Sequence, residues 1–133
     1  MIKYEVTRDP ELLKQYYELR ERCFREDLGI EDFDGSEDAK DKQGQIMIAH
    51  KNGQCVGGVR ISLDLPNDKS ISNLSVDMRA SCSWERFVFH PDERSTKFSR
   101  EFLANLIDVC HALDFKHAFV LSSLRNARFY RLF

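Results

Sequence analysis

Hydrophobic and polar positions in the first thirty residues predict a short strand followed by a long helix. Residues 2–6 alternate apolar and polar side chains, as expected for a half-buried strand. Asp9 is a good helix cap and Pro10 suits the first helical position, so we expect the helix to begin there. Apolar side chains recur at helical spacing over residues 10–28, and Gly29 is expected to end this helix.

The next apolar runs predict an antiparallel hairpin. Residues 45–49 and 55–63 are both strand-like, and the Asn52-Gly53 pair between them is typical of a tight hairpin turn. Two consecutive glycines in the second run would let another backbone or a ligand approach closely.

The second half of the chain predicts a buried strand that leads directly into a capped helix. Residues 84–89 form an apolar, β-prone run that Pro91 ends. Hydroxyl side chains within 95–99 offer caps ahead of residues 101–113, whose apolar side chains recur at helical spacing. Residues 117–122 are typical of another short buried strand. Strand, helix and strand together imply a right-handed parallel crossover.

Two further segments carry weaker patterns. Residues 64–83 contain many serines and a Pro-Asn pair, which predicts a loop with one short helix or strand. Residues 122–133 favour a helix. Because the chain has 133 residues and shows no internal repeat, we expect a single domain, residues 1–133, of mixed α/β (α+β) class.

Composition argues against several classes of protein. The net charge of -2 is unlike that of a general nucleic-acid binder, and no apolar run is long enough to predict a membrane span. The first residues lack a secretory signal pattern and the cysteines are scattered, so we expect free thiols and a cytoplasmic protein. His111 and His117 near Cys110 make too small a ligand set to predict a metal site.

The start of the predicted helix near residue 96 is a candidate anion-binding site. The first N–H groups of a helix have no carbonyl partner within it, and Arg94 and Lys97 add positive charge beside them. A pyrophosphate could therefore bind there. Alternatively, the cap serves only the helix and the basic side chains are simply solvated.

Two arginines are singled out by their positions in the predicted elements. Arg20 falls on an apolar helical stripe between Tyr17 and Phe24, so a carboxylate elsewhere in the chain should pair with it. The acidic residues 31–42 supply candidates and predict a partly ordered loop, with a fully solvated loop as the alternative. Arg60 is expected either to line a polar cleft or to lie exposed at a sheet edge.

The order of these elements resembles the GNAT N-acyltransferase superfamily. In that family the central strand and the loop after it, of form Arg/Gln-x-x-Gly-x-Gly/Ala, hold the pantetheine and pyrophosphate of coenzyme A. Residues 94–99 match this loop at its basic first and small last positions, with Lys97 in place of the middle glycine. The resemblance implies a mixed, mostly antiparallel central sheet flanked by helices, here without the family's C-terminal strands.

A finer resemblance is to acyl-homoserine-lactone (autoinducer) synthases, a GNAT branch that takes acyl groups from acyl carrier protein. Residues 19–29, LRERCFREDLG, are similar to that branch's Arg-x-x-(Val/Cys)-Phe…Leu-Gly segment. The similarity continues in Asp38-x-x-Asp41, in GVRI at 58–61 and in RFV at 86–88, in the same order. The tryptophan that follows Leu-Gly in that branch is absent, and homoserine lactone is not the product we expect.

The resemblance implies roles for the matching residues. Phe24 would pack beside the acyl or substrate pocket, and Arg86 would anchor the central strand. A charged network would order the N-terminal lid and shape the site for the amine; its members are Arg20, Asp38, Asp41 and Arg60. Donor binding is implied for residues from the central strand to the helix start: Val88, Phe89, Arg94, Ser95, Lys97, Phe98 and Ser99.

Acyl transfer from a thioester to an amine needs a neutral nucleophile, so some group must accept the proton of the amine. Glu85 is the candidate base, acting directly or through a water, unless it merely pairs with Arg60 or Arg86. Backbone N–H groups of the splayed strand near Val88 would polarise the thioester carbonyl. By its position in the last helix, Tyr130 would protonate the leaving thiolate, with simple packing as the alternative.

Two functions remain open at this stage. The first is an N-acyltransferase that moves an acyl group from acyl-CoA, or from the phosphopantetheine of acyl carrier protein, to a small amine or amino-acid-like acceptor. The second is a noncatalytic, shortened module that binds an acyl donor, a carrier protein or its own copy as a homodimer. Lys97 favours the second function, whereas Glu85 and the charged network favour the first.

Overall fold

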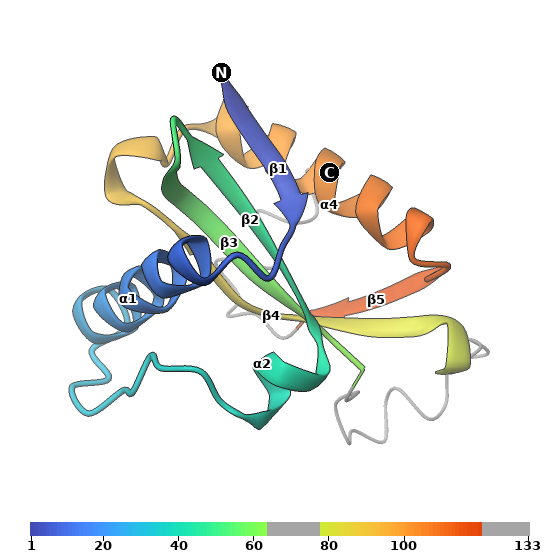
Figure 1. Cartoon of the computed structure of the whole chain (residues 1–133), viewed down its shortest axis with the longest axis horizontal. Helices are drawn as coiled ribbons and strands as arrows, with labels where there is room; N and C mark the ends of the chain where they lie inside the picture. The colour runs from blue at the N-terminus through green and yellow to red at the C-terminus, as the bar shows by residue number, and fades with distance from the viewer. Residues whose placement is uncertain (64–77, 121–133) are drawn as a thin grey trace.

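The computed structural model describes residues 1–63 and 78–120 (Figure 1). Within these two ranges, five strands form one sheet in the order β1-β2-β3-β4-β5. Successive strands pair antiparallel except for β4 and β5, which are parallel and joined by a helix. The structure thus has the mixed, mostly antiparallel sheet with flanking helices that the sequence predicts.

The elements run along the chain in the order strand, helix, hairpin, strand, helix, strand. Their bounds are β1 Ile2–Val6, α1 Pro10–Glu26, α2 Ala39–Gln43, β2 Gln45–Lys51, β3 Gln54–Ser62, a 3₁₀ turn Met78–Ala80, β4 Ser81–Phe89, a 3₁₀ turn Pro91–Glu93, α4 Thr96–Ala112 and β5 His117–Val120.

Several of these elements differ from the sequence-based expectation. The first helix ends at Glu26, two residues early, because Asp27 closes it by donating its N–H to the carbonyl of Cys23. The acidic segment is not only a loop, since Ala39–Gln43 is helical. β4 begins at Ser81, ahead of the apolar run. The helix expected over 122–133 lies outside the described residues.

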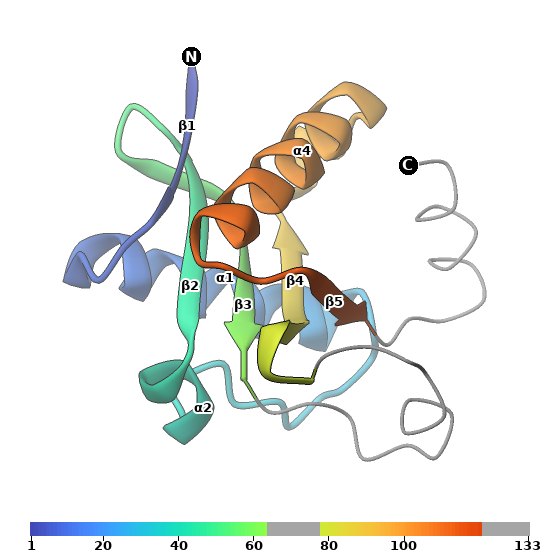
Figure 2. The ribbon, with the colours of Figure 1, turned by 90° about the vertical axis from the view of Figure 1, so that its right-hand side faces the viewer.

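The two long helices cover opposite faces of the sheet, as Figure 2 shows with α4 in front and α1 behind. Strand β2 contributes buried side chains to both faces of the sheet. Ile46 and Ile48 pack in the cluster under α1, whereas Met47 and Ala49 pack in the cluster under α4. This alternation follows from the two-residue repeat of a strand and explains why the run is apolar at every position.

Close packing of α1 on β3 depends on one of the two consecutive glycines. A Cβ atom at Gly58 would lie 2.5 Å from the ring of Tyr16. Tyr16 is fully buried, and its hydroxyl donates a hydrogen bond to the carbonyl oxygen of Arg86 on β4 at 2.9 Å. The glycine therefore admits a tyrosine side chain that connects α1 to the middle of β4.

Candidate functional site

A buried ionic cluster connects α1, α2 and the central strands. The guanidinium of Arg20 donates to both carboxylate oxygens of Asp41, at 2.9 and 2.8 Å. It also donates to the carbonyl oxygens of Gly35 and Ser36, at 2.9 and 3.0 Å. The side chains of Arg20 and Asp41 are 1% and 0% exposed, so the expected carboxylate partner of Arg20 is Asp41.

Arg60 joins this cluster from β3. Its guanidinium contacts three carboxylates: Asp38 at 3.1 Å, Asp41 at 3.2 Å and Glu85 at 2.7 Å. Only 1% of its side chain is exposed, so Arg60 neither lines an open cleft nor lies at a sheet edge. A guanidinium loses its hydrating water when it is buried, and these carboxylates compensate for that loss.

Electrostatics fixes the charge state of the cluster. Burial alone would raise the pKa of Asp41, but the hydrogen bonds from Arg20 and the Asp38 N–H, with the charges of both arginines, lower it to about 2. Burial likewise opposes the charge of Arg20, but the hydrogen bond with Asp41, the charge of Asp41 and the interactions with Tyr16 together outweigh that effect and raise the pKa of Arg20. Both groups therefore stay ionised at neutral pH and hold the surrounding segments together.

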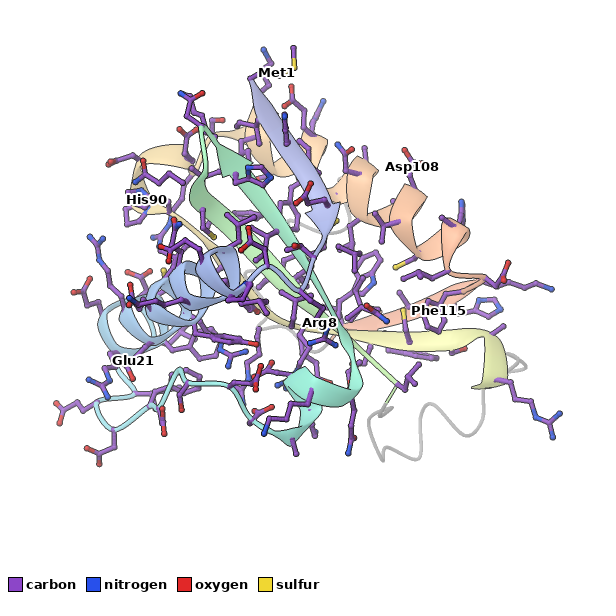
Figure 3. The ribbon with its side chains drawn as sticks, viewed as in Figure 1. Met1, Arg8, Glu21, His90, Asp108 and Phe115 are labelled. Carbon is purple, nitrogen blue, oxygen red and sulfur yellow. The ribbon has the colours of Figure 1, made fainter. Side chains whose placement is uncertain are left out.

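The segment between α1 and β2 is ordered around this cluster. Asp38 and Asp41 form a reciprocal capping box for α2, each carboxylate accepting the backbone N–H of the other at 2.9 Å. Arg8 binds the other end of α2, donating to the carbonyl oxygen of Asp41 at 2.9 Å and to that of Gly44 (Figure 3). Gly35 packs against α1, where a Cβ would lie 2.4 Å from that of Glu21.

β4 contains an irregularity at Arg86, whose φ of 57° places it in the left-handed region. Opposite it, the pairing with β3 is irregular between Gly58 and Arg60. The side chains change phase at this point. Trp84 and Phe87 both reach α4, through a 3.3 Å contact with Cys110 Sγ and a ring contact with Phe102. They are three positions apart, and in a regular strand residues at an odd offset point to opposite faces.

The same irregularity directs two neighbouring charged side chains toward the α1 face. Glu85 pairs with Arg60 in the ionic cluster, and 24% of its side chain is exposed. The guanidinium of Arg86 lies over the rings of Phe24 and Phe33, 5.4 and 5.0 Å from their centroids. Phe24 comes from α1 and Phe33 from the segment after it. This face of β4 therefore carries a carboxylate and a cation side by side.

One edge of β4 lacks a neighbouring strand along more than half its length within the described residues. β5 pairs only with residues 81–84 of β4, and its described part ends at Val120. His90 donates its N–H to the Val56 carbonyl of β3 at 2.8 Å. Because alternate residues point their N–H groups to opposite sides, the N–H of Phe89 is directed away from β3, toward the open edge.

The start of α4 follows this edge after one short turn. Ser95 caps the helix by accepting the N–H of Phe98 at 3.1 Å, and Ser99 Oγ donates to the Ser95 carbonyl at 3.0 Å. Phe98 and Ser99 are buried, while Lys97 is exposed. The helix itself offers no acceptor to the N–H groups of residues 96 and 97. These two donors and the Lys97 ammonium are suited to an anion.

Arg94, expected beside that anion, is held against α1. It donates to the carbonyl oxygen of Phe89 at 3.1 Å and pairs with Asp27 at 2.5 Å. About two fifths of each paired side chain is exposed, at 41% and 43%. Arg94 thus joins the end of α1 to the turn after β4.

Comparison with known proteins identifies the family. The family model described as "Acetyltransferase (GNAT) family" matches residues 13–133. The chain belongs to the GNAT acetyltransferase family. No curated protein sequence matches it significantly.

Solved structures share this fold at low sequence identity. A GNAT-family acetyltransferase from Staphylococcus aureus superposes with a TM-score of 0.71 at 14% identity, covering 99% of this chain and 82% of its own. Glucosamine-6-phosphate N-acetyltransferase from Arabidopsis thaliana gives 0.63 at 12% identity, with 99% and 89% covered. The enzyme AAC(6')-Iy, solved with the bisubstrate analogue CoA-S-monomethyl-acetylneamine, gives 0.65 at 15% identity, with 99% and 86% covered.

Several residues of this GNAT site were not predicted from the sequence. Asp27 holds Arg94, Phe33 contacts Arg86, and Tyr16 binds the backbone at the irregularity. A signal existed for Phe33, which is the one aromatic residue within the acidic segment 31–42. Tyr16 lies on the apolar stripe of α1, so its position in the sequence predicted only packing against the sheet.

The remaining sequence-based predictions concern groups outside the ionic cluster and the edge of β4. Tyr130 lies outside the described residues. Within 1–63 and 78–120 no group of three metal-binding side chains forms, and none of the helices there is long and apolar enough to cross a membrane. A pocket of about 690 Å³ opens beside α1, but none of the predicted site residues lines it.

Proposed function

We propose that this GNAT protein is an N-acyltransferase that moves an acyl group from acyl-CoA to a small amine. The observation that carries the proposal is the edge of β4 beyond Trp84. It has no strand partner from β5 within the described residues, and it leads directly to the capped start of α4. An extended thioester arm can pair with such an edge as an added strand would.

The donor is expected to lie along β4 with its anionic end at α4. The N–H of Phe89 would bind an oxygen of the pantetheine arm or of the thioester, and Val88 would line the α1 side. The pyrophosphate would bind the N–H groups after Ser95, with Lys97 as its counter-charge. Arg94 would contribute if it exchanged Asp27 for the phosphate; Phe98 and Ser99 support the loop from within the core.

The reaction forms one amide bond and breaks one thioester bond. The neutral amine attacks the carbonyl carbon, and the electron pair of the C–S bond leaves with the sulfur. The amine nitrogen loses a proton to Glu85 through a water, and the thiolate gains a proton. Tyr130 is our candidate for that second proton transfer, on the basis of the family resemblance alone.

The acceptor is expected to approach from the α1 side of β4. Phe24 would contact it, while the buried side chains of Arg20, Asp41 and Arg60 would act indirectly by holding residues 27–44 in place. The clustering of Arg20, Asp38, Asp41 and Arg60 also supports the finer proposal of an autoinducer-synthase-like enzyme. In that case acyl carrier protein would present the arm.

A specific contact favours the second candidate, a noncatalytic module that binds an acyl donor or its own copy. Glu85 already pairs with Arg60 at 2.7 Å, which is the structural role that the sequence left open for this carboxylate. Catalysis then requires the exposed part of the carboxylate to reach a water next to the amine.

Thiol release separates these two functions. The protein is incubated with acyl-CoA thioesters of increasing chain length, or with the acylated carrier protein, and a panel of primary amines. Amine-dependent release of thiol, with the N-acyl product found by mass spectrometry, is the result we expect. Donor binding without thiol release for any amine would support the noncatalytic module instead.

A further inference from the structure

Arg86 is a cation on the acceptor side of the site that pairs with no carboxylate in the described part of the chain. Within the described residues its guanidinium forms ring contacts with Phe24 and Phe33 but no ion pair or hydrogen bond. By contrast, the guanidinium of Arg60 contacts three carboxylates and that of Arg20 contacts one carboxylate in a bidentate pair. Arg86 is half-buried, so its donors remain accessible.

The backbone at Arg86 is held in a conformation that a non-glycine residue adopts at a cost. Its φ of 57° is in the left-handed region, where glycine is preferred. The hydrogen bond from buried Tyr16 to the Arg86 carbonyl fixes this conformation. A glycine would relieve the strain, so the presence of an arginine indicates that its side chain has a use.

The charge around Arg86 favours an anion. Burial lowers the pKa of Arg86, and the positive charges of Arg60 and Arg20 lower it further, against the opposing effects of Asp38 and Glu85. The aromatic rings hold the planar guanidinium in one orientation without using its N–H donors. A carboxylate can accept two of those N–H groups at once.

We propose that Arg86 binds the carboxylate of the acceptor, so that the acceptor is an amino acid. The inference rests on the proposed function and names the chemical class of its amine. Glu85 and Arg86 are consecutive residues, with Cα atoms about 3.8 Å apart, and both face α1. An α-amino acid carries its amine and carboxylate on one carbon, so its amine can lie near Glu85 while its carboxylate binds Arg86.

Each amino acid has a matched control in its own carboxamide, which keeps the amine and the side chain but loses the negative charge. We expect kcat/KM for amino acids to exceed that for their carboxamides. In Arg86→Met, kcat/KM for amino acids should fall about 10- to 100-fold, while that for carboxamides changes little. Arg86→Lys should keep part of the preference, and Arg22→Met, on the exposed face of α1, should keep all of it.

The ratio of amino acid to carboxamide is internal to each variant, so partial unfolding does not affect it. Equal kcat/KM for amino acids and carboxamides in the native protein would overturn the inference and leave the acyltransferase proposal standing. A preference for phosphorylated amines over amino acids would also overturn it.

If no amine is acylated, the proposed function fails, and the Arg86 site is tested by binding alone. The NMR signal of the Arg86 side-chain N–H should then shift on addition of free amino acids but not of their carboxamides. The absence of such a shift for the whole amino-acid panel would overturn the inference.

Discussion

Arg60 on β3 donates a 2.7 Å hydrogen bond to Glu85 on β4, and through Asp41 it is connected to Arg20 on α1. One ionic cluster therefore joins the candidate base to the helix and the segment that cover the acceptor side. The same contact positions the carboxylate, so Glu85 is the residue on which the catalytic account depends.

Replacing Glu85 with Gln tests that role. The amide keeps the size of the side chain and can still accept a hydrogen bond from Arg60, so the fold should be retained. Loss of the proton acceptor should reduce kcat by about 100-fold or more, with little change in donor affinity. Glu26→Gln, an exposed carboxylate on α1 that pairs with Arg22, is the matched control. Unchanged turnover in Glu85→Gln would exclude this residue as the base.

Replacing Asp41 with Asn tests the structural role of the cluster. The substitution leaves Arg20 and Arg60 buried without their shared carboxylate, and breaking a buried ion pair costs about 3–5 kcal/mol. Urea unfolding should show a correspondingly lower midpoint. Glu37→Gln removes a carboxylate from the same segment, where its contact with Lys42 is exposed, and should change stability by less than about 0.5 kcal/mol. Equal stability of the two variants would contradict the account.

The pH dependence of stability follows from the low pKa of Asp41. In the unfolded chain this carboxyl has its ordinary pKa of 3.8, and in the folded protein its pKa is about 2. The folded state binds the proton more weakly, so the contribution of Asp41 is fully present above pH 3.8 and is lost as the pH falls toward 2. The difference in unfolding free energy between the native protein and Asp41→Asn should therefore shrink over this interval. A constant difference would show that Asp41 is not held ionised.

The hydrogen bond from Tyr16 to the Arg86 carbonyl is tested by Tyr16→Phe. Tyr16 is fully buried, so the substitution leaves a backbone carbonyl without its donor and should cost about 1–3 kcal/mol. The hydroxyl of Tyr4 is exposed and lies 3.4 Å from Glu101, so Tyr4→Phe should be nearly neutral. Calorimetric unfolding compares the two. A neutral Tyr16→Phe would show that this contact does not hold the irregularity in β4.

The order of the elements could be predicted because the apolar pattern in each segment has a simple physical cause. The Asn52-Gly53 turn fixes the hairpin, the Asp9-Pro10 pair fixes the start of α1, and Ser95 caps α4 as its position suggests. The burial cost of a lone guanidinium likewise predicted that Arg20 has a carboxylate partner, which the contact with Asp41 confirms.

The remaining features depend on tertiary contacts that no local pattern reports. Arg86 adopts a left-handed conformation that its residue type does not favour, so the residues of β4 do not indicate that the strand changes phase there. The short helix α2 was missed because its cap is an aspartate pair, Asp38 and Asp41, in place of the usual Ser or Thr with Glu. The pairing of Arg94 with Asp27 joins segments far apart in the sequence.

Amide hydrogen exchange, measured residue by residue with and without acyl-CoA, tests most directly whether the donor binds along β4. The account predicts that added acyl-CoA slows exchange of the N–H groups of Phe89, Thr96 and Lys97, while amides of β1 on the far edge of the sheet exchange as before. The account would be contradicted if acyl-CoA slowed exchange only at other amides, or if saturating acyl-CoA slowed exchange nowhere.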